Sequence, residues 1–412
     1  MITPTLVFYL IIGILMINFL LESVLDFLNE KHFDDAIPKE LEDVYNLKEY
    51  KKSQEYKKEN AKFGRISAIF SLIITLLFLF FKGFAYVDHF ARTYSNNEII
   101  ISFIFFGIIL LASDILTTPF DYYHTFVIEE KYGFNKMNKK TFWLDKVKTW
   151  FLSIIIGGIL LTVIIWFYQK TGTQFWIYAT LILAVFSIFM TLFYSSLIVP
   201  LFNKQTPLPD GELKDAIKEF ASKADFKLDN IYVIDGSKRS SKANAYFSGF
   251  GAKKRIVLYD TLIKDLNNDE IIAVLAHEIG HYKKKHVFIN MILSIVLTGF
   301  TLYLLSKFID SKILSEALSV KTPSFHIGLI AFALLYMPIS IITSLVMNIL
   351  SRKMEYQADD FAKKQFNAKD LVSALKKLTK NSLSNLTPHP AYVFVHYSHP
   401  SLLQRVKNLM KK

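Results

Sequence analysis

Long apolar runs alternate with charged stretches along most of the chain. The apolar runs cover residues 4–25, 66–87, 98–119, 147–168, 175–199, 287–308 and 325–350. Each is long enough for a helix rising about 1.5 Å per residue to cross the roughly 30 Å hydrocarbon core of a bilayer. The pattern therefore predicts a mostly α-helical, polytopic membrane protein with about seven transmembrane helices.

Two stretches between these runs have a soluble character. Residues 30–65 carry nine Lys or Arg and nine acidic residues, which predicts a charged, helical connection in water. Residues 200–286 begin with a helical period over 211–226 and continue with short runs typical of β-strands. These β-like runs are 231–234, 245–247 and 255–259. We therefore expect a small α+β unit between the fifth and sixth spans.

The same pattern divides the chain into four regions. They are a five-span N-terminal membrane region over 1–199 with the charged loop 30–65, an α+β segment over 200–286, spans six and seven over 287–350, and a C-terminal helical segment over 351–412. No Lys or Arg precedes the first span and no small-residue cleavage site follows it, so we expect a retained helix and not a signal peptide.

Charge indicates the orientation of the spans. Residues 120–146 carry five Lys or Arg and residues 200–286 are rich in Lys, whereas 88–98 and 169–174 carry one each. Since positively charged loops stay in the cytosol, we expect the N-terminus outside, the C-terminus inside and 200–286 in the cytosol. The net charge of +12 then reflects loops at a membrane surface, and we expect no nucleic-acid partner.

Several polar residues fall within the predicted spans or near their ends. They are Asn18, Glu22, Lys82, Asp114, Asn290 and Asn348. Such groups are costly against lipid, so we expect them to face protein or an internal watery cavity. The chain has no cysteine, which excludes disulfides and Cys-based metal sites, so a zinc site would have to use His and carboxylate ligands.

One apolar run contains the motif His277-Glu278-Ile-Gly-His281. In a helix, His277 and His281 are one turn apart and project from the same face. That spacing suits two imidazoles that hold one Zn²⁺, with Glu278 as the general base. Asn267 and Glu270 can form a capping box at the start of this helix. Two surface histidines on an ordinary amphipathic helix are the alternative interpretation.

A catalytic zinc site also needs a third protein ligand and an open position. His286 is close, but it follows His277 by nine residues and would lie on the opposite face of the helix, so we discard it. Spans six and seven form a hairpin, which brings His281 and Glu355 out of the membrane on the same side. Glu355 is therefore the candidate ligand, and Asp359 one turn later can hold an imidazole N–H. The alternative is a charged juxtamembrane helix.

Further candidates lie near the C-terminus and in the α+β segment. His396 or His399 could stabilise the oxyanion of a tetrahedral intermediate, and Arg405 could hold a carboxylate in the same network. An edge strand before the zinc motif could bind a peptide by adding it as another strand, the alternative being a purely structural strand. The residues of this candidate strand are Asn244, Ala245, Tyr246 and Phe247.

These residues together resemble the integral-membrane zinc CAAX prenyl protease, type I. The resemblance covers nearly the whole chain and rests on segments 126–135, 200–203, 235–240, 244–247, 255–262, 277–281, 351–359 and 396–405. It implies seven membrane helices that enclose a large water-filled chamber, with a small α+β, gluzincin-like zinc metallopeptidase domain opening into it. Its implied partners are peptide or protein substrates, prenylated in this family, and membrane lipid.

The resemblance also implies the roles of individual residues. His277, His281 and Glu355 would bind one Zn²⁺ per chain, with Glu278 as the base. Asn244, Ala245 and Tyr246 would bind the substrate backbone. Asp359, His399 and Arg405 would support the zinc site.

The chain departs from the family pattern at few places. Ser401 stands where the family often has Pro, and no retrieval signal is evident before Lys412. With its many Lys, Ile and Asn residues, the composition suggests a bacterial homologue in a cytoplasmic membrane; a eukaryotic one would lie in the endoplasmic reticulum.

We therefore expect a membrane zinc endopeptidase that cleaves near the C-terminus of CAAX-type or membrane-associated proteins. Two other functions fit part of the pattern. A quality-control metalloprotease for misfolded membrane proteins would share the zinc motif. A transporter or scaffold with structural zinc would share the spans, but structural zinc sites are usually closed by four protein ligands.

Overall fold

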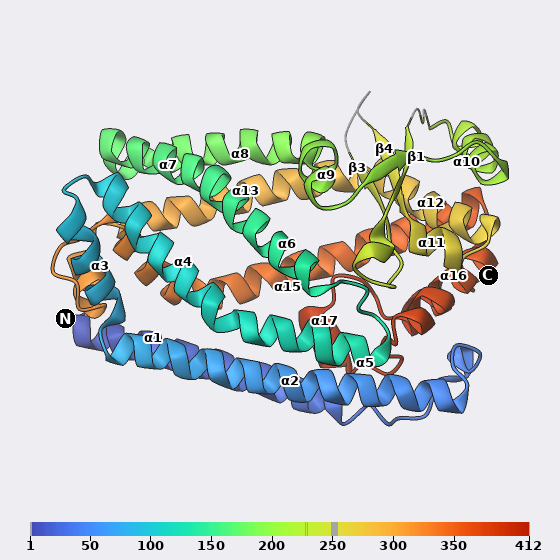
Figure 1. Ribbon diagram of the computed structural model, residues 1–412, viewed down its shortest axis with the longest axis horizontal. Helices are drawn as coiled ribbons and strands as arrows, with labels where there is room; N and C mark the ends of the chain where they lie inside the picture. Colours follow the sequence, from blue (N-terminus) through green and yellow to red (C-terminus); the bar gives the residue numbers. More distant parts are fainter. Residues whose placement is uncertain (1, 227, 229, 249–253, 412) are drawn as a thin grey trace.

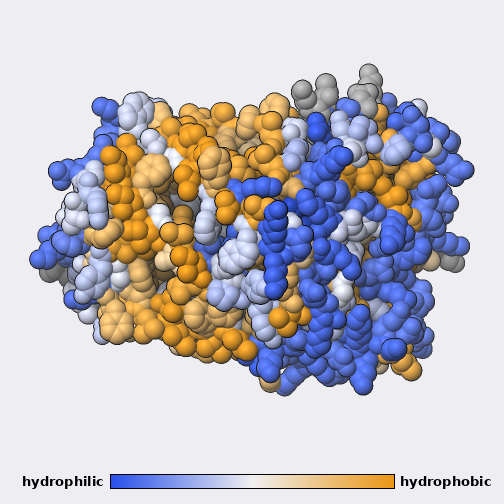
Figure 2. Space-filling view, viewed as in Figure 1, coloured by the Kyte–Doolittle hydropathy of each residue, from blue (hydrophilic) through white to orange (hydrophobic). Residues whose placement is uncertain are grey.

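The computed structural model describes residues 2–226, 228, 230–248 and 254–411. Long helices form one half of the molecule, and a small sheet with shorter helices forms the other half (Figure 1). Hydrophobic side chains cover the half with the long helices, while hydrophilic side chains cover the half with the sheet and a rim at the opposite end (Figure 2). The predicted fold class is confirmed: the protein is a mostly α-helical, polytopic membrane protein with a small α+β part.

The membrane half contains the apolar helices and the short helices that connect them. They are α1 (Pro4–Glu30), α2 (Leu47–Phe80), α3 (Gly83–Tyr94), α4 (Glu98–Tyr123), α5 (Glu130–Tyr132), α6 (Lys139–Leu152), α7 (Gly158–Thr171), α8 (Phe175–Phe193), α9 (Val199–Phe202), α13 (His286–Phe308), α14 (Lys312–Ala317) and α15 (Phe325–Gln365). Among the described residues, 6 segments are long and apolar enough to cross a membrane. One of them, Lys139–Phe202, has 64 residues and reverses direction between α7 and α8, so it contains both the fourth and the fifth predicted span (Figure 1).

The second predicted span, 66–87, was wrong at its end. Helix α2 continues the charged stretch directly into the apolar run and ends at Phe80, and α3 begins at Gly83. Between them Lys82 has a left-handed backbone with φ 57° and an exposed side chain. A Cβ on Gly83 would lie 2.5 Å from the Phe78 ring, so the close turn requires glycine there. Hydropathy cannot detect such a break because the residues on both sides are apolar.

Polar residues of the spans face protein, as expected. Lys146 donates to the Asp114 carboxylate at 2.7 Å, which joins α4 to α6. Asn348 donates to the Val395 carbonyl at 2.7 Å. Asn290 lines a cavity beside the His-Glu-x-x-His motif. Asp114 and Asn348 therefore have protein partners and Asn290 a polar cavity in place of lipid, whereas Lys82 is exposed.

The other half consists of a four-stranded sheet and the helices around it. The elements are β1 (Gln205–Pro207), α10 (Glu212–Lys223), β2 (Ile231–Ile234), β3 (Ala245–Ser248), β4 (Arg255–Tyr259), α11 (Asp260–Asp265), α12 (Asn268–Lys283), α16 (Ala368–Asn381), α17 (Pro390–His396) and α18 (Leu402–Leu409). The strand order is β1-β2-β4-β3, with β2 and β4 parallel and the other pairs antiparallel. Strand β1 was not predicted, since its three residues include a proline at the edge of the sheet. Strand β3 occupies the other edge within the described part of the chain.

Helix α12 lies at the centre of this half. Its apolar residues Ile271, Leu275 and Ile279 are each 1% exposed and belong to one core that also includes the sheet, α10 and α16. The core extends to Leu41 and Tyr50, so the charged N-terminal stretch packs on the sheet half instead of crossing free solvent. Most side chains of α12 are buried, and close packing fixes their rotamers, which suits a site that needs fixed geometry.

Candidate active site

The sequence of α12 specifies where the helix begins. The Asn267 side chain accepts from the backbone N–H of Glu270 at 2.9 Å, and the Glu270 carboxylate accepts from the backbone N–H of Asn267 at 2.9 Å. This is the predicted capping box. Ser373 and Lys377 of α16 also donate to Glu270, at 2.6 and 2.8 Å. Burial raises the pKa of Glu270, but these hydrogen bonds lower it by more, so the pKa lies below its ordinary value.

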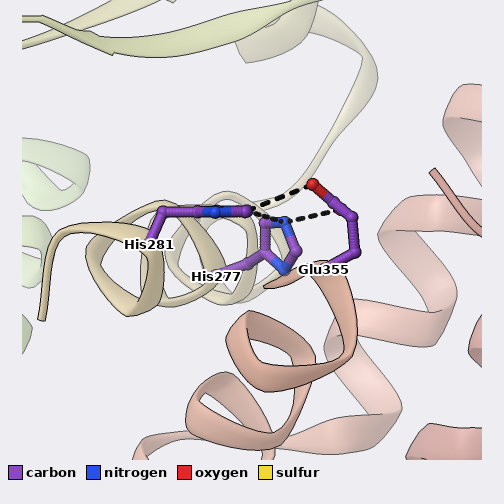
Figure 3. A group of neighbouring side chains, drawn as sticks. All are labelled: His277, His281 and Glu355. Atoms are coloured by element: carbon purple, nitrogen blue, oxygen red, sulfur yellow. Dashed lines mark hydrogen bonds and ion pairs between the residues drawn. The ribbon is translucent and has the colours of Figure 1, made fainter. Parts of the chain in front are cut away.

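Three side chains from two helices meet at one point (Figure 3). Nε2 of His281 lies 3.2 Å from Nε2 of His277. The Glu355 carboxylate from α15 lies 3.4 Å from Nε2 of His277 and 3.3 Å from Nε2 of His281. Ligand atoms at the corners of a tetrahedron with bonds of about 2.1 Å are separated by about 3.4 Å. The three side chains therefore have the spacing of zinc ligands.

Glu355 provides an independent test of whether a cation fits. The residue is 4% exposed, and its buried Oε2 makes no hydrogen bond to the described residues, although Nε2 of His277 lies 3.4 Å and a guanidinium nitrogen of Arg405 3.8 Å away. A buried carboxylate oxygen without a partner is costly, and a bound cation would remove that cost. The donor set of two imidazoles and one carboxylate, with no cysteine in the chain, suits Zn²⁺.

His277 is held by an ion pair behind it. Its Nδ1 lies 2.8 Å from Oδ1 of Asp359, which is fully buried. Arg405 donates to both carboxylate oxygens of Asp359, at 2.9 and 2.5 Å. Burial lowers the pKa of His277, but the adjacent carboxylates of Asp359 and Glu355 outweigh it and raise the pKa to about 9. The ion pair thus fixes the ring so that Nε2 faces His281 and Glu355.

His286 lies beside the three candidate ligands, and its predicted placement on the opposite helix face was wrong. Helix α12 ends at Lys283, and Lys285 adopts a left-handed backbone with φ 60°. The chain therefore turns back, and Nδ1 of His286 lies 3.0 Å from Nδ1 of His281. A lysine in this conformation gives no sequence signal, unlike the glycine that usually marks it.

A cavity of about 250 Å³ opens beside the three candidate ligands. Its lining includes Glu278, which is half-buried, and His399. Nε2 of His399 lies 3.2 Å from the Glu355 carboxylate, and its side chain is 61% exposed. His396, the other candidate of the C-terminal segment, points elsewhere: its Nε2 lies 3.2 Å from the Glu22 carboxylate of α1. The structure therefore brings His399 to the cavity and places His396 outside it.

Arg352 was not predicted as a site residue, yet it positions the segment that carries His399. Its guanidinium donates to the carbonyls of Val393, Phe394 and Tyr397 at 3.3, 3.3 and 2.5 Å. Val393 and Phe394 lie in the last turn of α17 and Tyr397 caps it, at a helix end where carbonyls generally lack N–H donors from a following turn. Arg352 and Asn348, both of α15, therefore hold the end of α17, from which the chain continues to His399 at the cavity.

Strand β3 borders the cavity on its sheet side. Phe247 lines both the cavity of about 250 Å³ and an adjoining cavity of about 640 Å³. Asn244, exposed, and Tyr246 line the adjoining cavity. Ala245 pairs with Leu258 of β4. In the described part of the chain β3 pairs only with β4, so its outer edge borders these cavities without a neighbouring strand.

Comparisons with known proteins agree with one another. Residues 27–204 match the family described as CAAX prenyl protease N-terminal, five membrane helices, and residues 207–412 match peptidase family M48. The chain is 36% identical over 411 residues to the CAAX prenyl protease 1 homolog of Arabidopsis thaliana, covering 96% of both chains. It is 36% identical over 428 residues to CAAX prenyl protease 1 of Saccharomyces cerevisiae, covering 97% of this chain and 94% of the relative.

A solved structure is similar over its full length. The crystal structure of S. mikatae Ste24p matches with a TM-score of 0.94 and 35% sequence identity, covering 100% of both chains. The resemblance inferred from the sequence is confirmed by these comparisons. They favour a peptidase over the transporter or scaffold.

Proposed function

The chain belongs to the CAAX prenyl protease 1 group of peptidase family M48, and we propose that it binds one Zn²⁺ through His277, His281 and Glu355. The protein is a multi-pass membrane metalloendopeptidase. The observation that carries the zinc proposal is the triangle of ligand atoms, whose separations of 3.2 to 3.4 Å leave room for one tetrahedral ion. With three protein ligands the fourth position stays open for reaction.

Zinc in such a site supplies Lewis-acid polarisation of the scissile carbonyl and lowers the pKa of water to about 7. Glu278 is the general base: its carboxylate takes a proton from the attacking water and returns that proton to the leaving amine. Glu278 is suited to this because it lines the same cavity as the three candidate ligands and is itself half-buried.

Other side chains bind and orient the substrate. A peptide added along Asn244, Ala245 and Tyr246 at the outer edge of β3 would hydrogen-bond to the backbone of Ala245, because the Asn244 carbonyl already accepts from the Tyr259 N–H of β4. An N–H of the His399 ring would donate to the oxyanion, since His399 lies beside Glu355 and is open to the cavity. Asp359 and Arg405 hold His277 and do not contact the peptide.

The substrate is a peptide or protein cleaved near a CAAX-type C-terminus. The names of the relatives support this class, and the lining of the cavities by Met190 of α8 and Asn290 of α13, helices of the membrane half, supports a lipid-attached substrate. We assign the catalytic half to the cytosol and the N-terminus to the other side. The positively charged loops favour that orientation, and the N-terminus lies at the end far from the sheet (Figure 1).

Cleavage of a farnesylated CAAX peptide and of its unprenylated twin by the purified protein tests the proposal. Glu278→Gln should retain one Zn²⁺ and lose cleavage by about 10²- to 10⁴-fold, because the carboxylate that moves the proton is gone. Cleavage of the farnesylated peptide alone supports a CAAX protease; cleavage of both makes the lipid incidental. Normal cleavage by Glu278→Gln would refute the role of Glu278, and a wild-type protein without bound Zn²⁺ would refute the metal site.

A further inference from the structure

The two candidate metal-binding histidines are held in different ways. Both present Nε2 to the centre of the site, and both use Nδ1 for a contact behind it. For His277 that contact is a carboxylate, Asp359, neutralised by Arg405. For His281 it is a second imidazole, His286, which is 2% exposed. A histidine that binds a metal through Nε2 carries its proton on Nδ1. Asp359 and His286 must therefore each accept a hydrogen bond from an Nδ1–H group.

Nδ1 of His286 can accept this hydrogen bond only if the proton of the neutral ring is on Nε2. Nε2 of His286 lies 2.8 Å from Oε1 of Gln357 on α15. An amide oxygen only accepts, so Nε2 of His286 donates to it and Nδ1 of the neutral ring is left as an acceptor. Nδ1 of His281 then donates to His286 at 3.0 Å, and its Nε2 keeps a free electron pair toward Glu355.

We propose that Gln357 and His286 form a neutral relay that sets the tautomer and the ring orientation of His281, and so positions this ligand for the metal. The inference rests on the ligand set proposed above. His286 is a positioning residue, because it acts on the metal through His281. The relay carries no net charge, so it orients the ligand without adding a second carboxylate beside Glu355.

The turn after α12 brings His286 of this relay next to His281. Lys285 holds a left-handed backbone with φ 60°, which is unfavourable for a residue with a side chain. The turn starts α13 at His286, one residue later, and brings the ring back beside α12. Both His281 and His286 line the same cavity, so the strained turn and the relay meet at the site.

The test is the affinity of the whole protein for Zn²⁺, measured by competition with a chelator, together with its thermal unfolding temperature. His286→Leu keeps the volume and removes the acceptor, so we expect about 10- to 100-fold weaker Zn²⁺ binding. His286→Asn places an amide oxygen where Nδ1 lies, so we expect its affinity within a few-fold of wild type. Gln357→Leu should weaken binding in the same direction by a smaller factor.

The matched control is His396→Gln, a histidine whose partner is Glu22 and which does not line the cavity. It should leave Zn²⁺ affinity unchanged. If His286→Leu and Gln357→Leu lower the unfolding temperature but bind Zn²⁺ as wild type does, the two residues are only structural and the relay is refuted. If wild-type protein binds no Zn²⁺, or His281→Ala binds it normally, the ligand set itself fails, which is a separate outcome.

Discussion

Gly280 lies inside the metal motif where α12 packs closely on α15. A Cβ at this position would lie 3.1 Å from the Cα and 3.1 Å from the carbonyl oxygen of Ala358, and 3.1 Å from the Cβ of Phe361. Carbon atoms pack at about 3.5–4.0 Å, and two of the three neighbours are backbone atoms that cannot rotate away. Gly280→Ala should therefore push the two helices apart by about 0.5 Å.

This separation changes the metal site because its ligands lie on both helices. His277 and His281 move with α12, whereas Glu355 moves with α15. Metal–ligand distances tolerate only about 0.2 Å, so an opening of about 0.5 Å leaves one bond poorly formed. We expect Gly280→Ala to bind Zn²⁺ about 10-fold more weakly and to lose about 1–3 kcal/mol of stability through overpacking.

Gly64→Ala is the matched control. Gly64 also lies in a helix, α2, and an added Cβ meets no atom of the described residues within 4 Å. Both substitutions gain the helix propensity of alanine, about 0.8–1.0 kcal/mol, so their difference reports the contact with α15 alone. Zn²⁺ competition and thermal unfolding measure both effects. Equal Zn²⁺ affinity and equal stability in the two variants would show that α12 and α15 adjust without cost.

Three further predictions address the metal, pH and the far end of the bundle. Chelation should abolish cleavage and leave the helical circular dichroism unchanged, because the core around α12 is apolar and complete; a loss of helix would indicate a structural metal. Glu270→Gln should cost about 1 kcal/mol at pH 7. The pKa of Glu270 in the folded protein lies below the ordinary 4.5, so its stabilisation is present above pH 4.5 and is lost as the pH falls through the folded pKa. Urea unfolding across this pH range should therefore show the stability difference between Glu270→Gln and wild type disappear. A stability difference that stays constant would contradict this prediction. Asp88 is 5% exposed and pairs with Arg92 and His326, so Asp88→Asn should destabilise by about 3 kcal/mol in thermal unfolding, while a change below about 1 kcal/mol would show that the pair is dispensable.

The sequence was informative wherever the signal is local. Bilayer crossing depends on hydropathy over about 20 residues, so most spans were placed correctly. The start of α12 depends on Asn267 and Glu270, which are three positions apart, and the predicted capping box is present. The hairpin of spans six and seven was enough to suggest that His281 and Glu355 lie together, and the structure places them 3.3 Å apart.

The sequence was uninformative where the backbone takes a conformation that its residue does not favour. Lys82 and Lys285 both have a left-handed backbone, and a lysine gives no warning of it. The first broke a predicted span, and the second returned His286 to the site from which we had excluded it. His396 and His399 are three residues apart, and the end of α17, held by Arg352 and Asn348, falls between them, so that only His399 of the two lines the cavity.

Helix α15 runs without a break through 41 residues, or about 60 Å, from the far surface of the membrane half to the sheet half. A helix whose apolar part is longer than the local hydrocarbon thickness tilts to fit it. Because Glu355 lies on this helix beyond its apolar part, a change in tilt moves Glu355 relative to the histidines of α12. We therefore expect the thickness of the surrounding lipid to affect the spacing between Glu355 and the two histidines of α12.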